Sequence, residues 1–328
     1  GIDATVDTST IPGMPRDKDG MNRFGFGGRA GYKNSRWDVS VTGKNTETHS
    51  EIDAREFSDD DNYILDFERQ MIGYSASWQA DTGFAVSLNG GHSFMARTSL
   101  NDSSLVDNAG NYDHSYYKGN YTGETFSNEL QLQFKQKNFS VVLGGGFSNQ
   151  MMSQNIYSYY QGFVFESSLD SLDLASRTNS FFALADMSGS LISEKAKAFS
   201  LSLGARSNKN NTFGSSITYQ VNPMVKVSET SSVYGNISSG YNAPSLYQLH
   251  SPDKDFVSTI TRGNVNLRPE TSVTKEFGVY QKINDKTGMR LGFYKTVVSD
   301  AIEYVYLWDK NTPLNMLSYL DYRGDTYL

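Results

Sequence analysis

Apolar and polar side chains alternate along much of the chain, in runs that are typical of two-faced β-strands. Residues 37–42, 84–88, 130–135 and 199–203 each carry an apolar side chain at every second position. Because successive side chains of a strand point to opposite faces, each of these runs has one apolar face and one polar face. About thirteen such runs can be counted, which predicts an all-β fold of antiparallel strands.

The connections between these runs fall into two groups that alternate along the chain. Short breaks lie at residues 33–35, 81–83, 135–138, 193–197, 228–231 and 284–288. Long polar segments alternate with them, at residues 47–64, 100–124, 153–177, 242–270 and 307–313, and only the break at 208–212 is not clearly long. A soluble sandwich has no reason to sort its connections in this way, whereas a transmembrane β-barrel keeps short turns in the periplasm and long loops outside. The pattern therefore predicts an antiparallel transmembrane β-barrel in a bacterial outer membrane.

Several runs are long enough to cross a membrane as tilted strands. Residues 22–32, 67–80 and 271–283 exceed the ~5–6 residues of an average soluble strand and suit the ~9–11 that span the hydrocarbon. The apolar face would then contact lipid, the polar face would line the lumen, and aromatic residues at strand ends would form interfacial girdles. Bacterial single-chain barrels close with an even number of strands, and open edges are not tolerated in lipid. A count of about thirteen strands therefore predicts part of a larger barrel.

Composition excludes several other classes of protein. The mean hydropathy of -0.50 and the lack of an apolar stretch near ~18 residues exclude a helical membrane protein. The net charge of -7 opposes nucleic-acid binding, and the absence of cysteine leaves no disulfide framework or thiolate metal site. The four histidines are scattered, with no catalytic grouping, so no enzyme is indicated. No linker divides the chain, so residues 1–328 are expected to form one partial β-barrel domain.

Two sequence boxes in the C-terminal third resemble those of a known family. Residues 240–249, GYNAPSLYQL, resemble the G-[FY]-[RK]-A-P-[ST]-L-x-[EQ]-L signature of TonB-dependent outer-membrane receptors, and residues 263–272, GNVNLRPETS, resemble their G-N-P-N-L-[KR]-P-E-[TS]-S box. The matching residues are Gly240, Ala243, Pro244, Leu246, Asn264, Asn266, Leu267, Pro269 and Glu270. Asn242 and Val265 depart from the family's usual Arg or Lys and its usual Pro. Proline at strand ends and Asn or Gly in turns favour a structural role for these boxes over direct ligand contact.

The resemblance implies a fold and a function. Barrels of this family have about 22 strands around a lumen closed by a plug, so an N-terminal plug domain and closing C-terminal strands are expected outside residues 1–328. The resemblance further implies a receptor of the Gram-negative outer membrane that imports a large scarce nutrient, with energy from the TonB complex acting through the plug. The expected ligand is a metal chelate, either a ferric siderophore or cobalamin, with haem as the alternative. A passive porin and a surface adhesion protein are the alternatives from other classes.

Aromatic residues in the long loops are candidates for ligand contact. Tyrosine gives contact area at small entropic cost, so clustered tyrosines could form a cage for a large ligand, with an aromatic girdle as the competing interpretation. The candidates are Tyr116, Tyr117, Tyr157, Tyr159, Tyr160 and Tyr247. By resemblance, His250 could ligate haem iron, as a loop histidine does in haem-importing members. Those members usually keep the basic residue that Asn242 replaces, which argues against haem.

One acidic run is the candidate metal site. Asp59, Asp60 and Asp61 could gather oxygen ligands for Ca²⁺ in an outer loop. The run lacks the spaced D-x-D-x-D-G pattern of a dedicated site, so a solvated stretch of charge is the favoured interpretation. No other cofactor is expected.

Overall fold

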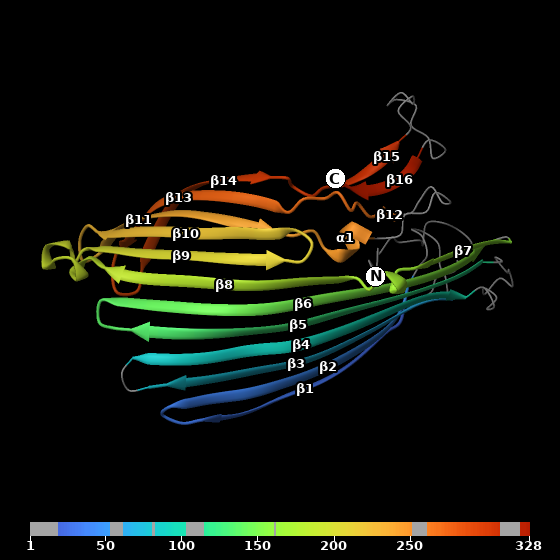
Figure 1. The fold of residues 1–328 in the computed structure, drawn as a ribbon, viewed down its shortest axis with the longest axis horizontal. Helices are drawn as coiled ribbons and strands as arrows, with labels where there is room; N and C mark the ends of the chain where they lie inside the picture. Colours follow the sequence, from blue (N-terminus) through green and yellow to red (C-terminus); the bar gives the residue numbers. More distant parts are fainter. Residues whose placement is uncertain are drawn as a thin grey trace.

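The main feature of the computed structural model is one large antiparallel sheet of thirteen strands (Figure 1). The structure describes residues 19–52, 62–80, 83–102, 115–160, 162–250, 261–308 and 322–328. The strands that follow one another across the sheet are β1 (Met21–Lys33), β2 (Trp37–Glu51), β3 (Tyr63–Gln79), β4 (Phe84–Asp102), β5 (Ser115–Lys135), β6 (Phe139–Tyr160), β8 (Ala175–Ser188), β9 (Phe199–Asn210), β10 (Gly214–Lys226), β11 (Ser231–Asn242), β13 (Glu270–Lys282) and β14 (Gly288–Ser299). The thirteenth, β7 (Phe163–Ser168), pairs with β6 beside this path. The predicted all-β antiparallel fold is confirmed.

Smaller elements lie in the connections between the long strands and after β14. A second, three-stranded sheet contains β12 (Thr261–Arg262), β15 (Tyr304–Trp308) and β16 (Tyr322–Tyr327). The helical elements are α1 (Leu246–His250) and the 3-10 helices η2 (Asp170–Leu172), η3 (Gly189–Leu191) and η4 (Glu194–Ala196). Within the described residues, none of these helices has the length and apolar character needed to cross a bilayer.

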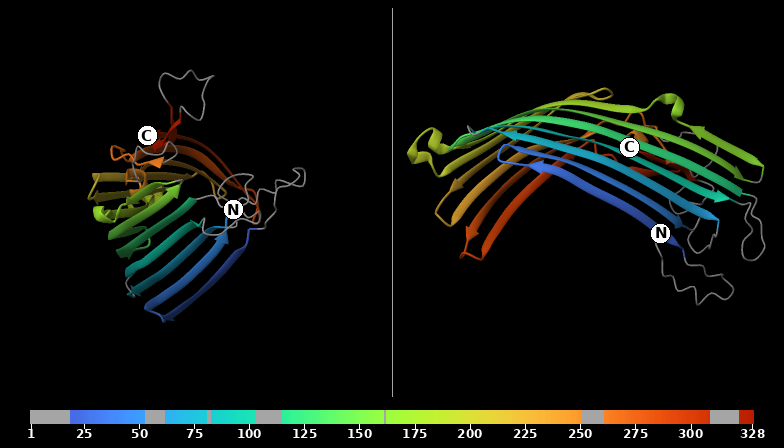
Figure 2. Two further views of the ribbon diagram at one scale, coloured as in Figure 1. Left: turned by 90° about the vertical axis from the view of Figure 1, so that its right-hand side faces the viewer. Right: turned by 90° about the horizontal axis from the view of Figure 1, so that it is seen from below.

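Neighbouring strands of the large sheet pair in continuous register over most of their length. For example, β5 and β6 pair from Ser115 opposite Tyr160 to Lys135 opposite Ser140. The strands twist together, so the sheet curls into a trough whose two edges are β1 and β14 (Figure 2). An open, curled sheet of this kind is a partial barrel, as the strand count predicts.

Six of the short connections lie at one end of the strands, the left end in Figure 1. They join β1 to β2, β3 to β4, β5 to β6, β8 to β9, β10 to β11 and β13 to β14. The other end carries α1, β7 and the small sheet. The structure therefore sorts most connections as the sequence predicts, and this sorting predicts that the end with the short turns faces the periplasm.

The connection between β9 and β10 is a short turn at the outer end, where it departs from the sorting of connections. Only residues 211–213 separate Asn210 from Gly214. The Asn210 side-chain oxygen accepts hydrogen bonds from the backbone N–H groups of Thr212 (2.8 Å) and Phe213 (3.1 Å), and its amide donates to Ser176 and Thr178 at 3.1 and 2.9 Å. Asn210 thus closes the turn and links it to β8. The lengths of the connections along the chain do not reveal this side-chain interaction.

The orientation of the barrel can be tested by cysteine labelling, because the chain itself has no cysteine. Asp285→Cys places a thiol in the β13–β14 turn, and Thr212→Cys places one in the β9–β10 turn. We expect a membrane-impermeant maleimide to label Thr212→Cys on intact cells and Asp285→Cys only after permeabilisation. The reverse labelling pattern would contradict the assignment of the two ends.

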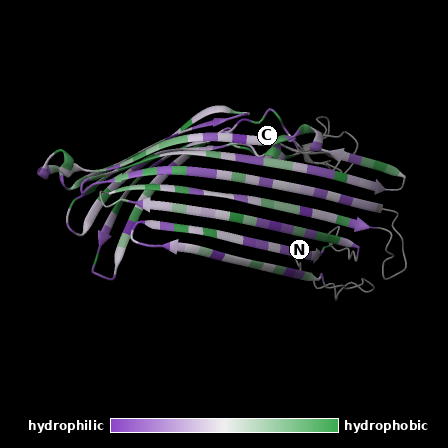
Figure 3. Cartoon of the chain, turned by 60° about the horizontal axis from the view of Figure 1, so that its bottom comes forward, coloured by the Kyte–Doolittle hydropathy of each residue, from purple (hydrophilic) through white to green (hydrophobic). Residues whose placement is uncertain are grey.

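Hydrophilic and hydrophobic residues alternate along many strands of the sheet, as the stripes of Figure 3 show, so its two faces differ in polarity. On the concave face Glu129 reaches across β6 and β8 to Arg206, with 3.5 Å between Oε2 and Nη1. Residues of opposite parity, among them Leu130 and Leu132, lie on the convex face, where their side chains are 47% and 40% exposed. The convex face therefore presents the apolar side chains that contact lipid.

Aromatic side chains form two bands on the convex face. The lower band follows the short turns and contains Tyr32, Trp37, Trp78, Phe84, Phe134, Phe139 and Phe199. The outer band contains Phe24, Phe26, Phe126, Phe147, Phe181 and Tyr219. On β5, Phe134 and Phe126 are eight positions apart (134 − 126), which corresponds to about 20 Å along the membrane normal for a strand tilted by ~40°. The lower band lies at strand ends, as expected from the sequence, whereas on β5 and β6 the outer band lies within strands that continue beyond it.

The sheet itself has no apolar core. In the described part of the chain, the buried apolar side chains are Leu169, Leu174, Leu249 and Leu267, and all four lie in connections at the outer end. The backbone ladder, the lipid and whatever fills the lumen must therefore stabilise the long strands.

Candidate ligand-binding site

Four side chains of the concave face meet near the outer ends of β3, β4 and β5. Arg97 on β4 stands opposite Tyr121 on β5, and Asn101 on β4 is paired with Tyr63 on one side and with Tyr117 on the other. The pairing register of three strands thus brings together residues that are far apart in the sequence. We call Tyr63, Arg97, Tyr117 and Tyr121 the tyrosine–arginine cluster.

The rings and the guanidinium of the cluster are in direct contact. The Arg97 Cζ lies 4.3 Å from the centroid of the Tyr121 ring, and the Tyr117 and Tyr121 hydroxyl oxygens are 2.9 Å apart. The Tyr63 and Tyr117 rings pack edge to face, with centroids 6.4 Å apart. Gly119 makes this arrangement possible, because a Cβ there would lie 2.7 Å from the Tyr117 hydroxyl oxygen and 2.9 Å from Tyr121 Cε2.

The cluster carries one positive charge and no compensating negative charge. Burial, together with the hydrogen bond to Tyr121, raises the pKa of Tyr117, so this phenol stays neutral at physiological pH. Across the described ranges, no carboxylate lies within ion-pair distance of Arg97. The cluster therefore offers a cation and amphipathic rings to the lumen, a combination suited to a conjugated anion.

Two thioethers extend the cluster toward the periplasm. Met95 lies two residues below Arg97 on β4 and is opposite Gly123, which in turn is opposite Met152 on β6. The absence of a side chain at Gly123 leaves room for Met95, whose Cγ would be 3.4 Å from a Cβ at that position. The methionines give the site an adaptable apolar floor.

The tyrosines predicted from the sequence are divided between the two faces. Tyr117 belongs to the cluster, whereas Tyr116, Tyr157 and Tyr159 lie on the convex face, where the Tyr116 and Tyr157 rings pack 5.7 Å apart. Tyr160 has the concave parity and pairs with Phe163 at the tip of the β6–β7 hairpin. Tyr247 is exposed on α1. Their contacts with a ligand stay a prediction.

Sequence reasoning did not select Tyr63 and Arg97. Each lies in a strand with few other signals of function. Counting alternate residues from the β3–β4 and β5–β6 turns would have placed both on the polar face with Gln131. The signal that could have selected Tyr63 and Arg97 is therefore the face of the sheet on which each side chain lies.

The residues of the first family box hold the exit of β11 in place. Asn242 Nδ2 donates to Glu270 Oε2 at 2.6 Å, and Glu270 Oε1 accepts from the Ile302 N–H at 2.8 Å. Both bonds keep the pKa of the Glu270 carboxyl below its usual range. Asn242 thus has a carboxylate partner although it replaces the family's basic residue.

The second family box folds against α1. Ser245 and Gln248 cap the start of α1 reciprocally, with N–H to side-chain oxygen distances of 2.9 and 3.2 Å. The Asn264 N–H donates to the Gln248 carbonyl at 2.8 Å, and the Asn264 side chain accepts from the Asn266 N–H at 3.0 Å. Gly263 passes so close to α1 that a Cβ there would lie 2.6 Å from the Leu249 carbonyl oxygen.

Other box residues lie in the same loop, apart from Gly240, which belongs to β11. Leu267 and Pro244 are buried, and Gly240, Ala243, Leu246 and Pro269 are partly buried. The hydrogen bonds of the two boxes join parts of the same loop, and none of them by itself assigns a ligand.

His250 ends α1 and is partly buried. Burial lowers the pKa of its imidazole, so the ring is neutral at pH 7 and its nitrogen lone pair is available. Asp59, Asp60 and Asp61, the Ca²⁺ candidates, lie outside the described residues.

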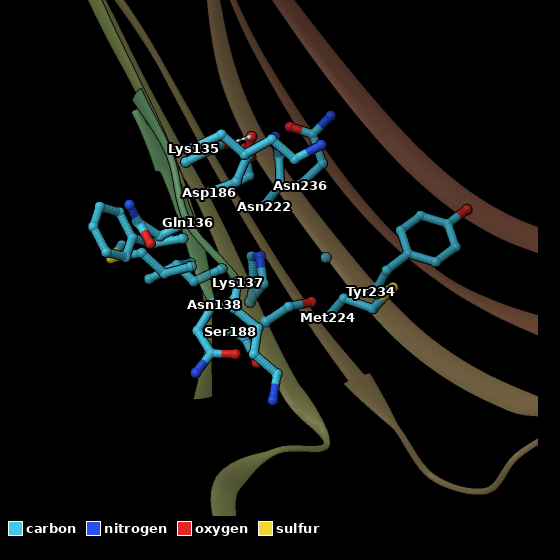
Figure 4. A pocket seen from close by; sticks show the side chains of 18 of the residues that line it. Lys135, Gln136, Lys137, Asn138, Asp186, Ser188, Asn222, Met224, Tyr234 and Asn236 are labelled. Carbon is cyan, nitrogen blue, oxygen red and sulfur yellow. Dashed lines mark hydrogen bonds between the residues drawn. The ribbon is translucent and has the colours of Figure 1, made fainter. Parts of the chain in front are cut away.

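A second feature of the concave face is a cavity of about 610 Å³ near the periplasmic turns (Figure 4). Its polar lining includes Lys137, Asp186, Asn222, Asn236, Glu276 and Arg290. Arg290 Nε donates to the Tyr234 hydroxyl at 2.7 Å, and that hydroxyl donates to Glu276 at 2.8 Å. The side-chain oxygens of Asn222 and Asn236 are buried and have no hydrogen-bond partner within the described residues. This wall therefore presents polar groups to the lumen.

Comparisons with known proteins agree with this geometry. The sequence matches a family model described as "TonB dependent receptor-like, beta-barrel" over residues 13–326. No curated protein sequence matches the chain.

Similar solved structures include three outer-membrane proteins of different ligand classes. The copper transporter OprC superposes with a TM-score of 0.68 at 12% identity, over 94% of this chain and 48% of that one. A mutant of the ferric enterobactin receptor PfeA from Pseudomonas aeruginosa gives 0.64 at 15%, over 97% and 48%. The hemophore receptor HasR of Serratia marcescens, with its hemophore HasA and heme, gives 0.65 at 12%, over 93% and 49%.

The chain spans about half the length of the structures that it matches. At these identities the likeness shows the fold alone. The differing ligands of the three proteins do not distinguish between substrates for this chain.

Proposed function

Because this chain belongs to the TonB-dependent receptor family, a family of Gram-negative outer-membrane barrels, we propose that it forms the ligand-capturing barrel region of a receptor for an anionic metal chelate. A ferric siderophore is the first candidate. Import would draw on the TonB complex acting through the family's plug domain. The solved relatives are receptors and transporters, not enzymes.

The observation that carries this proposal is the uncompensated charge of Arg97 within the tyrosine–arginine cluster. The guanidinium faces the lumen, is stacked on Tyr121, and has no carboxylate partner in the described part of the chain. An anionic chelate with flat conjugated groups would pair with the guanidinium and stack on the rings. Cobalamin, whose single phosphodiester is balanced by the cationic cobalt–corrin centre, fits this charge less well.

The polar cavity near the periplasmic turns supports the family's gated mechanism. The buried side-chain oxygens of Asn222 and Asn236 accept no hydrogen bond within the described residues. Glu276 adds a negative charge and Arg290 a positive charge. A plug domain with polar residues would satisfy these groups. A lumen filled in this way would hold the chelate until the plug is rearranged.

The proposed ligand class can be tested on the purified full-length receptor. Ferric siderophores of the catecholate and hydroxamate types, cobalamin and haem would be titrated separately, and binding followed by tryptophan fluorescence. We expect at least one anionic ferric siderophore to bind tightly. Tight binding of cobalamin alone would refute the assignment.

Haem is the second candidate, because its propionates are also anionic and HasR carries heme. His250, neutral and partly buried at the end of α1, is the candidate axial ligand. We expect His250→Ala to leave siderophore binding unchanged. A Soret shift that wild-type protein shows on haem addition and His250→Ala lacks would instead identify a haem receptor.

A further inference from the structure

Two lysines stand side by side on the lipid-facing surface of the barrel. Lys275 on β13 is directly opposite Lys295 on β14 in the antiparallel register. Both are exposed, and both have the convex parity shared by Phe277 and Phe293. The pair therefore points away from the lumen and from the tyrosine–arginine cluster.

The height of the pair follows from counting convex side chains upward from the periplasmic turns. Lys275 and Lys295 are each the fourth from the β13–β14 turn. On β8 and β10 the fourth position is Phe181 and Tyr219, members of the outer aromatic band, whereas on β5 and β6 the outer-band residues Phe126 and Phe147 are the fifth. The lysines therefore lie at the level of the outer aromatic band or one position below it, from which a lysine side chain can extend to the outer headgroups.

The immediate surroundings of the pair are apolar. Phe277 and Phe293, directly below, are 56% and 68% exposed, and Val297 above Lys295 is 53% exposed. Within the described ranges neither ammonium has a carboxylate at ion-pair distance. Like charges directly opposite one another across two strands destabilise a sheet, so this arrangement requires compensation.

Another like-charged pair on the convex face shows how side chains of the barrel itself can compensate the repulsion between two equal charges. Glu47 is opposite Glu68 on β2 and β3, above the outer aromatic band. Each carboxylate accepts a hydrogen bond from an amide of its own strand, Asn45 at 2.8 Å and Gln70 at 2.6 Å. The lysine pair lies deeper and has no such partner in the described chain.

We propose that Lys275 and Lys295 bind the phosphate of an outer-leaflet lipid headgroup. The flexible stems let both ammonium groups rise to the headgroup level, where one phosphate between them would cancel their repulsion. The acyl chains of the same lipid would lie along Phe277, Phe293 and Ile237, which are exposed on the same face. A free phosphate ion shares the headgroup chemistry but lacks these apolar contacts, so the lipid is the preferred occupant.

The test uses the full receptor in nanodiscs and three probes: lipid A, lipid A stripped of its phosphates, and inorganic phosphate. Retained lipid is counted by native mass spectrometry. We expect lipid A to be retained, the stripped lipid not to be, and inorganic phosphate to bind at least tenfold more weakly than lipid A. Equal retention of the stripped lipid, or equally tight inorganic phosphate, would overturn the proposal.

Variants identify the site. Lys275→Gln combined with Lys295→Gln should lower lipid A retention at least tenfold. Lys275→Arg combined with Lys295→Arg keeps both charges and should preserve it. Arg177→Gln combined with Lys209→Gln removes two convex charges above the outer aromatic band and should also preserve it.

Retention by the Gln pair at the wild-type level, or equal loss in the Arg177 and Lys209 control, would refute the assignment. Heat-modifiable migration on gels verifies that each barrel is folded. Should the Gln pair fail to fold, the two single Gln variants are compared instead, and each should lower retention relative to the wild type.

Discussion

Replacing Leu130 by arginine is expected to destabilise the barrel by about 2–4 kcal/mol, the cost of a charge on the lipid face near the bilayer midplane. Leu130 lies midway between Phe134 of the lower aromatic band and Phe126 of the outer band, on the convex face. A guanidinium there cannot reach water without distorting the bilayer. Urea unfolding of the full receptor in lipid vesicles measures the effect.

The matched control is the neighbouring residue. Gln131 points to the concave face, where its amide donates to Glu129 at 2.7 Å. Arginine at this position would meet a carboxylate and polar surroundings, so Gln131→Arg should shift the unfolding free energy by less than about 1 kcal/mol. Equal destabilisation by both substitutions would mean that the register of β5 is wrong by one residue.

Replacing Arg97 by alanine is expected to weaken binding of the anionic chelate by about 2–4 kcal/mol, or roughly 30- to 700-fold in Kd. The substitution removes the cation that the tyrosine–arginine cluster presents to the lumen and the stacking surface over Tyr121. Isothermal titration of purified receptor with the ferric siderophore found in the binding panel gives Kd directly.

Lys118→Ala is the control for this loss of charge. Lys118 lies on the same part of β5 as Tyr117 and Tyr121, but it is exposed on the convex face opposite Tyr157. Its removal should leave Kd within about twofold, since a screened surface charge contributes little. An unchanged Kd in Arg97→Ala, or the same loss in Lys118→Ala, would exclude the cluster as the binding site.

The fold could be predicted from the sequence because a barrel repeats one physical rule on every strand. Alternation fixes the two faces, and the sorting of short and long connections fixes the two ends. The β9–β10 turn was not assigned, because its closure depends on the Asn210 side chain and its bonds to Ser176 and Thr178. The length of the connection alone does not reveal that a side chain closes the turn in this way.

The site was harder to predict than the fold. Clustered tyrosines were visible in the sequence, but composition cannot tell Tyr116 from Tyr117, which point to opposite faces. Arg97 and Tyr63 join Tyr117 only through the registers of β3, β4 and β5. When binding residues come from several strands, the register between the strands decides which of them lie together. The sequence of a single strand does not determine that register.

The four buried leucines, all outside the long strands, have a consequence for how the protein is made. In water this fold offers no apolar core in which Leu130, Leu143 or Phe181 could be buried. We therefore expect these strands to reach their native structure only in contact with a bilayer. Maturation and insertion are therefore a single event. We therefore expect the chain to need factors that shield its apolar positions before insertion, and expect loss of such factors to lower the amount of protein through aggregation and proteolysis.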